Sequence, residues 1–142
     1  VNLVCVGKLK ESYWRDAVTE YAKRLSRFCK WEVRELPERR SPEEEAESIL
    51  KECRGYTVAL AIEGKMCSSE QLAAKLKQLC DAGREITFVI GSSCGLAPRV
   101  KQAADELLSF SPMTFPHQMM RVILSEQVYR AFMINAGAEY HK

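Results

Sequence analysis

The stretch ITFVIG, residues 86–91, is the clearest structural signal in the chain: four apolar residues and a threonine, followed directly by glycine. A short uncharged run of β-branched and aromatic residues is typical of a strand buried on both faces of a sheet. A glycine directly after such a run marks its end and permits a turn. We therefore expect a buried strand at Ile86–Ile90 that ends at Gly91.

Helical and strand-like segments alternate on both sides of this stretch. Further strands are expected at Asn2–Gly7, Trp31–Leu36, Thr57–Ile62 and Leu107–Phe110. Helices are expected at Ser12–Phe28, at Pro42–Glu52, from Ser69 until Gly83, from Pro98 to about Glu106, and from about Gln118 to Asn135. Ser41 and Pro42 suit the start of the second helix, as an N-cap and a first-turn proline. Strands alternating with helices predict an α/β fold, with a mostly parallel sheet and helices on both faces.

Length and composition indicate one globular domain over residues 1–142. Apolar residues make up 46% of the chain and charged residues 28%, which excludes a disordered segment. Apolar runs such as Thr57–Ile62 are far shorter than the ~20 residues of a membrane span. Lys8, Lys10 and Glu11 interrupt any secretory signal, so a cytoplasmic protein without membrane attachment is expected. The net charge of +2 does not by itself indicate a nucleic-acid binder.

Six cysteines are scattered along the chain without a CxxC pair. Structural zinc needs closely spaced Cys and His ligands, so no metal site is expected. Reduced thiols are favoured over disulfides. Cys5 and Cys80 have apolar neighbours and are expected to be buried.

Three strand ends carry unusual loops, at residues 60–65 (LAIEGK), 90–96 (IGSSCGL) and 110–117 (FSPMTFPH). Ligands of open α/β sheets bind beyond the carboxyl ends of the strands. The Gly91–Gly95 spacing matches neither the dinucleotide fingerprint nor a P-loop, so classical NAD binding is disfavoured. The third loop is uncharged and offers backbone groups to a flat, apolar ligand. The alternatives are a simple tight turn at Gly91 and a rigid hydrophobic connector at 110–117.

Several of these segments together resemble a known family. They are LAIEGK at 60–65, FVIGSSCGL at 88–96, SFSPMTFPHQMMRV at 109–122, EQVYRA at 126–131 and the terminal YHK at 140–142, with VGKLKESYW at 6–14 near the start. This combination closely resembles the ribosomal RNA large subunit methyltransferase H family, within the SPOUT superfamily of knotted methyltransferases. The resemblance covers essentially the whole chain, and TFPHQMMR is its most specific block.

The resemblance implies methyl transfer from S-adenosylmethionine (SAM) to N3 of a pseudouridine in the helix 69 loop of 23S ribosomal RNA. The substrate would be the large subunit or the assembled ribosome. It also implies a homodimer and a C-terminal trefoil knot, a rare exception to the unknotted rule. The SAM contacts of the family fall on Leu60, Gly91, Phe110, Ser111, Pro112, Met113, Thr114 and Phe115. These positions lie in the three loops selected from the sequence.

Methylation of N3 needs its proton removed or the developing anion stabilised. Candidate side chains are His117, Arg121, Arg130, Tyr140 and His141, and the resemblance places Arg121, Tyr140 and His141 on the substrate side. The alternatives are that His117 caps the last helix and that the arginines form salt bridges or are solvated. The identity of a general base stays open. Met119 and Met120 are expected to pack in the core or a dimer interface.

The terminal Tyr140 and His141 are expected to complete the active site of the partner subunit, because the last helix is apolar almost all round and Gly137 permits a sharp exit.

Two residues depart from the family pattern: Ser92 stands where a second glycine is usual, and Cys94 replaces a commonly polar residue. A side chain at Ser92 could restrict the turn beside the cofactor. One rival interpretation is therefore a ribosome- or RNA-binding SPOUT module whose catalysis is weakened through Ser92. A separate alternative is a SPOUT methyltransferase that acts on tRNA.

Overall fold

The computed structural model describes residues 1–142 and contains five strands and five helices in alternation. The strands are β1 (Asn2–Val6), β2 (Glu32–Leu36), β3 (Tyr56–Met66), β4 (Ile86–Ile90) and β5 (Glu106–Ser109). The helices are α1 (Ser12–Leu25), α2 (Pro42–Glu52), α3 (Ser69–Asp81), α4 (Pro98–Ala103) and α5 (His117–Asn135). The expected order of elements is confirmed.

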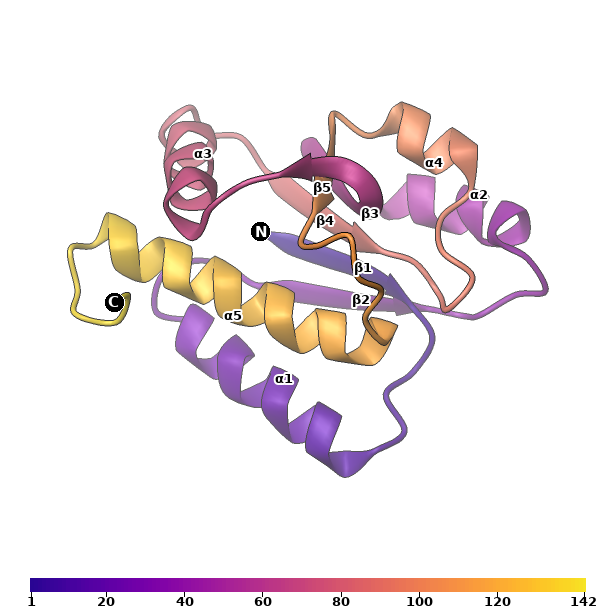
Figure 1. The fold of residues 1–142 in the computed structure, drawn as a ribbon, viewed down its shortest axis with the longest axis horizontal. Helices are drawn as coiled ribbons and strands as arrows, with labels where there is room; N and C mark the ends of the chain where they lie inside the picture. Colours follow the sequence, from indigo (N-terminus) through magenta and orange to yellow (C-terminus); the bar gives the residue numbers. More distant parts are fainter.

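All five strands form one parallel sheet in the order β2-β1-β4-β3-β5 (Figure 1). The strand predicted at Ile86–Ile90 is β4, which lies at the centre of the sheet and is buried at every residue. Because the sheet is parallel, the carboxyl ends of its strands share one edge, where ligands of such sheets bind.

Helices cover both faces of the sheet, as expected (Figure 1). One face packs against α1, α3 and α5 in a core around Phe88, Leu25 and Leu124. The other packs against α2 and α4 around Val89, Ile49 and Val100. The alternation of Phe88 and Val89 between the two cores follows from the two-residue period of a strand.

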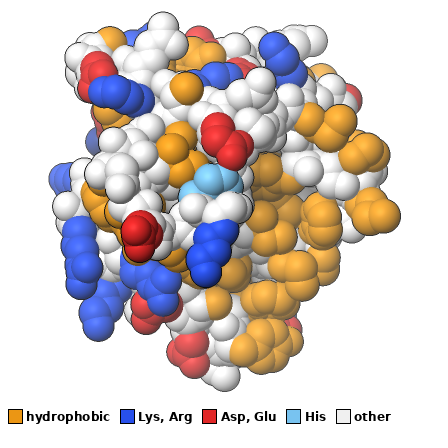
Figure 2. All heavy atoms as spheres, turned by 60° about the vertical axis from the view of Figure 1, so that its left-hand side comes forward, with side chains coloured by type: hydrophobic (Ala, Val, Ile, Leu, Met, Phe, Trp, Pro, Cys, Tyr) orange, Lys and Arg blue, Asp and Glu red, His pale blue; other side chains and the backbone are white.

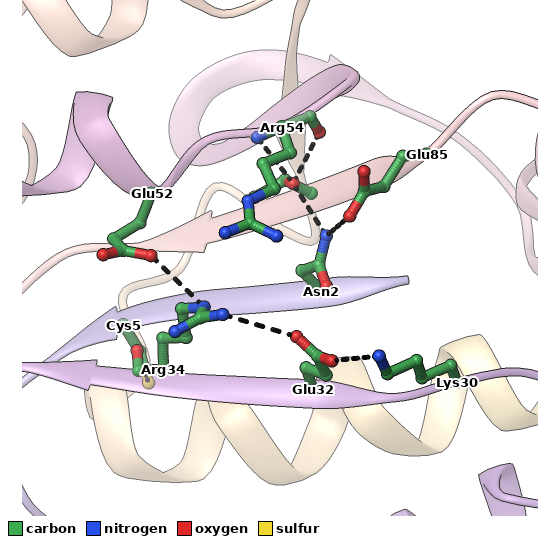
Figure 3. A network of polar contacts seen from close by, with 9 residues as sticks. Asn2, Cys5, Lys30, Glu32, Arg34, Glu52, Arg54 and Glu85 are labelled. Atoms are coloured by element: carbon green, nitrogen blue, oxygen red, sulfur yellow. Dashed lines mark hydrogen bonds and ion pairs between the residues drawn. The ribbon is translucent and has the colours of Figure 1, made fainter.

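The amino ends of β1 and β2 lie in a network of polar contacts (Figure 3). The amide of Asn2 donates to Glu85 (2.9 Å) and to Thr87 (3.3 Å). Arg34 pairs with Glu52 (3.2 Å) and with Glu32 (3.6 Å). These bonds link neighbouring elements at the edge opposite to the carboxyl ends of the strands.

Several expected boundaries were wrong by a few residues. The helix predicted to reach Phe28 ends at Leu25. Phe28 fitted the apolar pattern of that helix because its ring packs against the core, where it stacks on Phe132 (ring centroids 5.8 Å apart). The helix α4 ends at Ala103, because Asp105 bonds Thr57 through its backbone N–H and its carboxylate (2.9 and 2.8 Å).

The third strand extends further than expected, to Met66, with a register shift against β5 between Leu60 and Lys65. Cys80, expected in the core, is exposed, whereas Cys5 is buried as predicted. All six cysteines are free thiols. No helix has the length and apolar character needed to cross a membrane. The trefoil knot stays a prediction.

Candidate functional site

The three unusual strand-end loops meet in one cleft of about 650 Å³, at the carboxyl edge of β3, β4 and β5. A cleft of this volume is typical of sites for small molecules and cofactors. Its walls are the residues Leu60, Ala61, Ile62, Glu63, Ile90, Gly91, Ser92, Ser93, Cys94, Gly95, Leu96, Lys101, Leu108, Ser109, Phe110, Ser111, Met113, Thr114, Phe115, Pro116, His117 and Met120.

Most residues expected to contact a cofactor lie in these walls: Leu60, Gly91, Phe110, Ser111, Met113, Thr114 and Phe115. Pro112 does not, although both of its neighbours do. Met120, expected in the core or an interface, also lines the cleft. The sequence could have predicted this position of Met120, because Met120 follows His117 by three residues and residues three apart share a helix face.

The segment 60–65, expected as a loop after the strand, lies within β3, which bulges there with a register shift against β5 between Leu60 and Lys65. Glu63 pairs with Lys101 of α4 across the cleft wall (2.5 Å), and that hydrogen bond lowers the pKa of the Glu63 carboxyl. Gly64 has no room for a side chain, because a Cβ there would lie 2.7 Å from the backbone of Leu107. The sequence EGK therefore marks a close approach of β3 to β5.

The second loop folds tightly on itself. A Cβ at Gly91 would lie 2.6 Å from the carbonyl oxygen of Gly95, so glycine is required there by the loop's own backbone. Ser92 is buried, and its hydroxyl accepts a hydrogen bond from the backbone N–H of Cys94 (3.3 Å). Gly95 donates to the Ser92 carbonyl (2.9 Å). The Ser92 side chain is thus used within its own turn.

The third loop is held by two serines and leaves backbone donors free. The hydroxyl of Ser109 donates to the carbonyl of Ser111 (3.2 Å), and the Ser111 hydroxyl accepts from the N–H of Met113 (3.0 Å). The N–H groups of Thr114 and Phe115 make no hydrogen bond within the chain. Unpaired backbone donors in a cleft wall are binding groups for an acceptor on a ligand.

His117 begins α5 at the mouth of this loop. Its ring makes no hydrogen bond, and no side chain caps the helix, so the alternative of a capping histidine was wrong. Its pKa is lowered by burial and by the positive charge of Arg121, against an opposing effect of Glu38.

Arg121 lies in the interior instead of the cleft. Its side chain is 2% exposed and donates to the carbonyl oxygens of Val6 (2.9 Å) and Gly7 (2.7 Å) and to Glu35 (2.7 Å). These contacts join α5 to the carboxyl ends of β1 and β2. They favour the structural alternative over the expected role on the substrate side.

Tyr140 and His141 are docked on their own subunit. The Tyr140 hydroxyl donates to Glu126 (3.0 Å), and its ring packs edge-on against Tyr129. Burial and the bond to Glu126 raise the pKa of Tyr140 to about 12, so it is a neutral phenol at pH 7.

Both ring nitrogens of His141 have partners. Arg130, which can only donate, lies 3.0 Å from Nδ1, so Nδ1 accepts and Nε2 carries the proton toward Glu70 (2.6 Å). Arg130 in turn pairs with Glu126 (2.5 Å).

This tail is remote from the cleft of the same subunit. Its contacts Glu126 and Arg130 lie six and ten residues after Met120, the last cleft residue of α5, which is about 9 and 15 Å along the helix at the helical rise. The structure therefore does not bring Tyr140 and His141 together with the expected cofactor residues of their own chain.

The comparisons with known proteins agree with this geometry. Residues 1–141 match the model of a family described as "Predicted SPOUT methyltransferase". The chain belongs to the SPOUT methyltransferase family. As a SPOUT member it is a methyltransferase that takes its methyl group from SAM.

Relatives of this SPOUT chain include proteins named "Ribosomal RNA large subunit methyltransferase H". One from Bifidobacterium animalis subsp. lactis is 53% identical, and one from Levilactobacillus brevis is 50% identical. Each alignment covers 100% of this chain and 99% of the relative.

Solved structures share the SPOUT fold at low identity. A probable methylase family protein from Haemophilus influenzae has a TM-score of 0.60 at 13% identity, over 99% of this chain and 70% of that one. The SpoU methyltransferase AviRb from Streptomyces viridochromogenes, solved with AdoMet, has a TM-score of 0.52 at 12% identity. It aligns over 98% of this chain and 59% of its own.

Proposed function

We propose that this enzyme transfers a methyl group from SAM to N3 of a pseudouridine in the helix 69 loop of 23S ribosomal RNA. The substrate would be the large subunit or the assembled ribosome in the cytoplasm. The observation that carries the proposal is the cleft formed by the three loops, in a chain whose full-length relatives at about 50% identity are named as large-subunit rRNA methyltransferases.

The cleft fits SAM in size and in chemistry. Its uncharged loop walls suit an adenosine, and the free N–H groups of Thr114 and Phe115 can donate to acceptors on the adenine or the ribose. We assign cofactor contacts to Leu60, Gly91, Phe110, Ser111, Met113, Thr114 and Phe115, and a supporting role to Pro112. SAM supplies a methyl group already activated on a sulfonium, so the protein mainly has to align it with the nucleophile.

Several apolar side chains of α5 support a homodimer. Met119, Val122 and Ile123 remain partly exposed and belong to neither core. Figure 2 shows a broad hydrophobic area on its right, which is the side that faces the viewer in Figure 1, where α5 and α1 lie. Large exposed apolar areas are rare on monomeric soluble proteins and are typical of surfaces that contact another molecule, such as a second subunit.

The dimer would bring the tail of one subunit to the cleft of the other. A mixed dimer tests this: one chain carries Gly91→Val, and the other is truncated after Ala138. If the tail acts on the partner, one pocket combines an intact cofactor loop with an intact tail, and methyl transfer survives at up to about half of normal.

The control is the same pair of lesions placed in one chain, with an unaltered partner. That dimer should lose activity if the tail acts on the partner, because the intact cofactor loop then receives the truncated tail. It should keep up to about half of normal activity if the tail acts on its own subunit, because the unaltered chain then has a complete pocket. A dead mixed dimer, whose parents fold and associate, would contradict the arrangement in trans.

The function itself is tested by calorimetry with SAM and by methylation assays on intact ribosomes, free 23S rRNA and tRNA side by side. We expect SAM binding, and methyl transfer to pseudouridine N3 in the ribosome. Absence of SAM binding at millimolar concentration would favour a non-catalytic binding module. Preferential methylation of tRNA would favour the other SPOUT interpretation.

A further inference from the structure

Four side chains in the cleft walls carry groups that gain or lose protons: Glu63, Cys94, Lys101 and His117. A proton acceptor for the pseudouridine N3–H must come from this set if it belongs to the same chain as the cofactor loops. Arg121, Tyr140 and His141 of the same chain are outside it, because Arg121 is buried in its own contacts and the tail is docked about 9–15 Å further along α5 than Met120, the last cleft residue of that helix.

Three of the four are unsuited to accept this proton. Lys101 donates to Glu63 and offers no acceptor. The same bond engages the Glu63 carboxylate and moves its pKa from the ordinary 4.5 further away from neutrality. Cys94 carries a thiol, which is a weak hydrogen-bond acceptor.

His117 is the remaining group, and its surroundings leave it free. The ring is half-buried in the cleft wall at the first residue of α5, and neither nitrogen has a partner in the chain. Arg121 and Glu38 are the charged groups that act on it. The guanidinium of Arg121 is held in the interior by its hydrogen bonds to Val6, Gly7 and Glu35. Its positive charge therefore stays near the His117 ring but outside the cleft.

We propose that His117 accepts the N3 proton of the pseudouridine during methyl transfer, which rests on the proposed function above. The ring nitrogen takes the proton as N3 forms its bond to the methyl carbon. The bond between that carbon and sulfur breaks, and its electron pair stays on sulfur. The products are N3-methylpseudouridine and S-adenosylhomocysteine, and the imidazolium returns its proton to water.

A fixed positive charge beside the ring suits this role, because it favours neutral imidazole, the form that can accept. The pKa of His117 lies below its usual value of 6.5, so the ring is neutral at pH 7. Activity that needs the neutral ring is present above this pKa and lost as the pH falls through it. Protonation of a group with a lowered folded pKa also destabilises the protein in that acidic range.

The test compares His117→Gln with His141→Gln, since these are the two histidines of the chain. Single-turnover methyl transfer to ribosomes is measured between pH 5 and 9 in the full-length dimer, with SAM affinity measured separately. His117→Gln should slow transfer by about 10²–10⁴-fold, the usual contribution of a general base, without loss of SAM affinity. It should also remove the acidic break in the rate profile, whereas His141→Gln should keep that break.

NMR titration of the two ring signals, assigned through His141→Gln, gives a readout that does not depend on turnover. The His117 signal should titrate below pH 6.5. His117→Asn serves as a second variant if glutamine disturbs the start of α5. A folded His117 variant that keeps the wild-type rate and acidic break would overturn the proposal. If the wild-type enzyme methylated none of the RNAs, the proposed function would be contradicted instead. The NMR titration would still show whether the His117 ring is neutral at pH 7.

Discussion

Replacing Arg121 by alanine is expected to lower the free energy of unfolding by about 3 kcal/mol. The substitution leaves the carbonyl oxygens of Val6 and Gly7 without their donor and separates α5 from the carboxyl ends of β1 and β2. A charged hydrogen bond contributes more than a neutral one, and the empty volume adds to the loss. For a chain of this length the midpoint of thermal unfolding should fall by about 10 °C.

Urea denaturation of Arg121→Ala and Glu35→Gln separates the two sides of this contact. The Glu35 side chain is 38% exposed, so water can replace much of its interaction with Arg121. Glu35→Gln should therefore lower the free energy of unfolding clearly less than Arg121→Ala. Arg121→Ala with unchanged stability but lost methyl transfer would restore the arginine to the substrate side of the reaction.

Gly91→Val is expected to weaken SAM binding by more than about 100-fold, because the loop that follows β4 in the cleft wall must move. The first carbon of the side chain would already lie 2.6 Å from the oxygen and 2.8 Å from the carbon of the Gly95 carbonyl. These are backbone atoms, which cannot turn aside as a flexible side chain could. The collision is within the loop, so the effect does not require a direct clash with SAM.

Calorimetry with SAM, alongside a denaturation curve for each variant, distinguishes a damaged loop from a damaged fold. Gly95→Ala and Gly83→Ala form a matched pair, since both have a positive φ and open space around the missing side chain. Both should lose about 1 kcal/mol of stability, but only Gly95→Ala should affect SAM binding. Wild-type affinity in Gly91→Val would remove this loop from the cofactor site.

The sequence alone predicted the elements whose signals are local. The buried run Ile86–Ile90 is a central strand, and Ser41 caps a helix at Pro42–Glu52, because strand period, capping and proline geometry depend on residues close in the chain. Parallel order followed from the alternation of strands and helices. That order predicted one ligand edge, and the three loops that carried the family resemblance do meet there.

Only the tertiary structure decided which side chains are free to do chemistry. Arg121 looked like a substrate contact, but its partner Val6 lies 115 residues away, and no local pattern reports such a bond. Phe28 extended a helical pattern because it stacks on Phe132, and Cys80 looked buried but faces solvent. The docking of Tyr140 and His141 against Glu126, Glu70 and Arg130 is equally non-local. Local sequence sets strands, turns and caps, whereas the burial and pairing of a long polar side chain depend on which distant elements pack beside it.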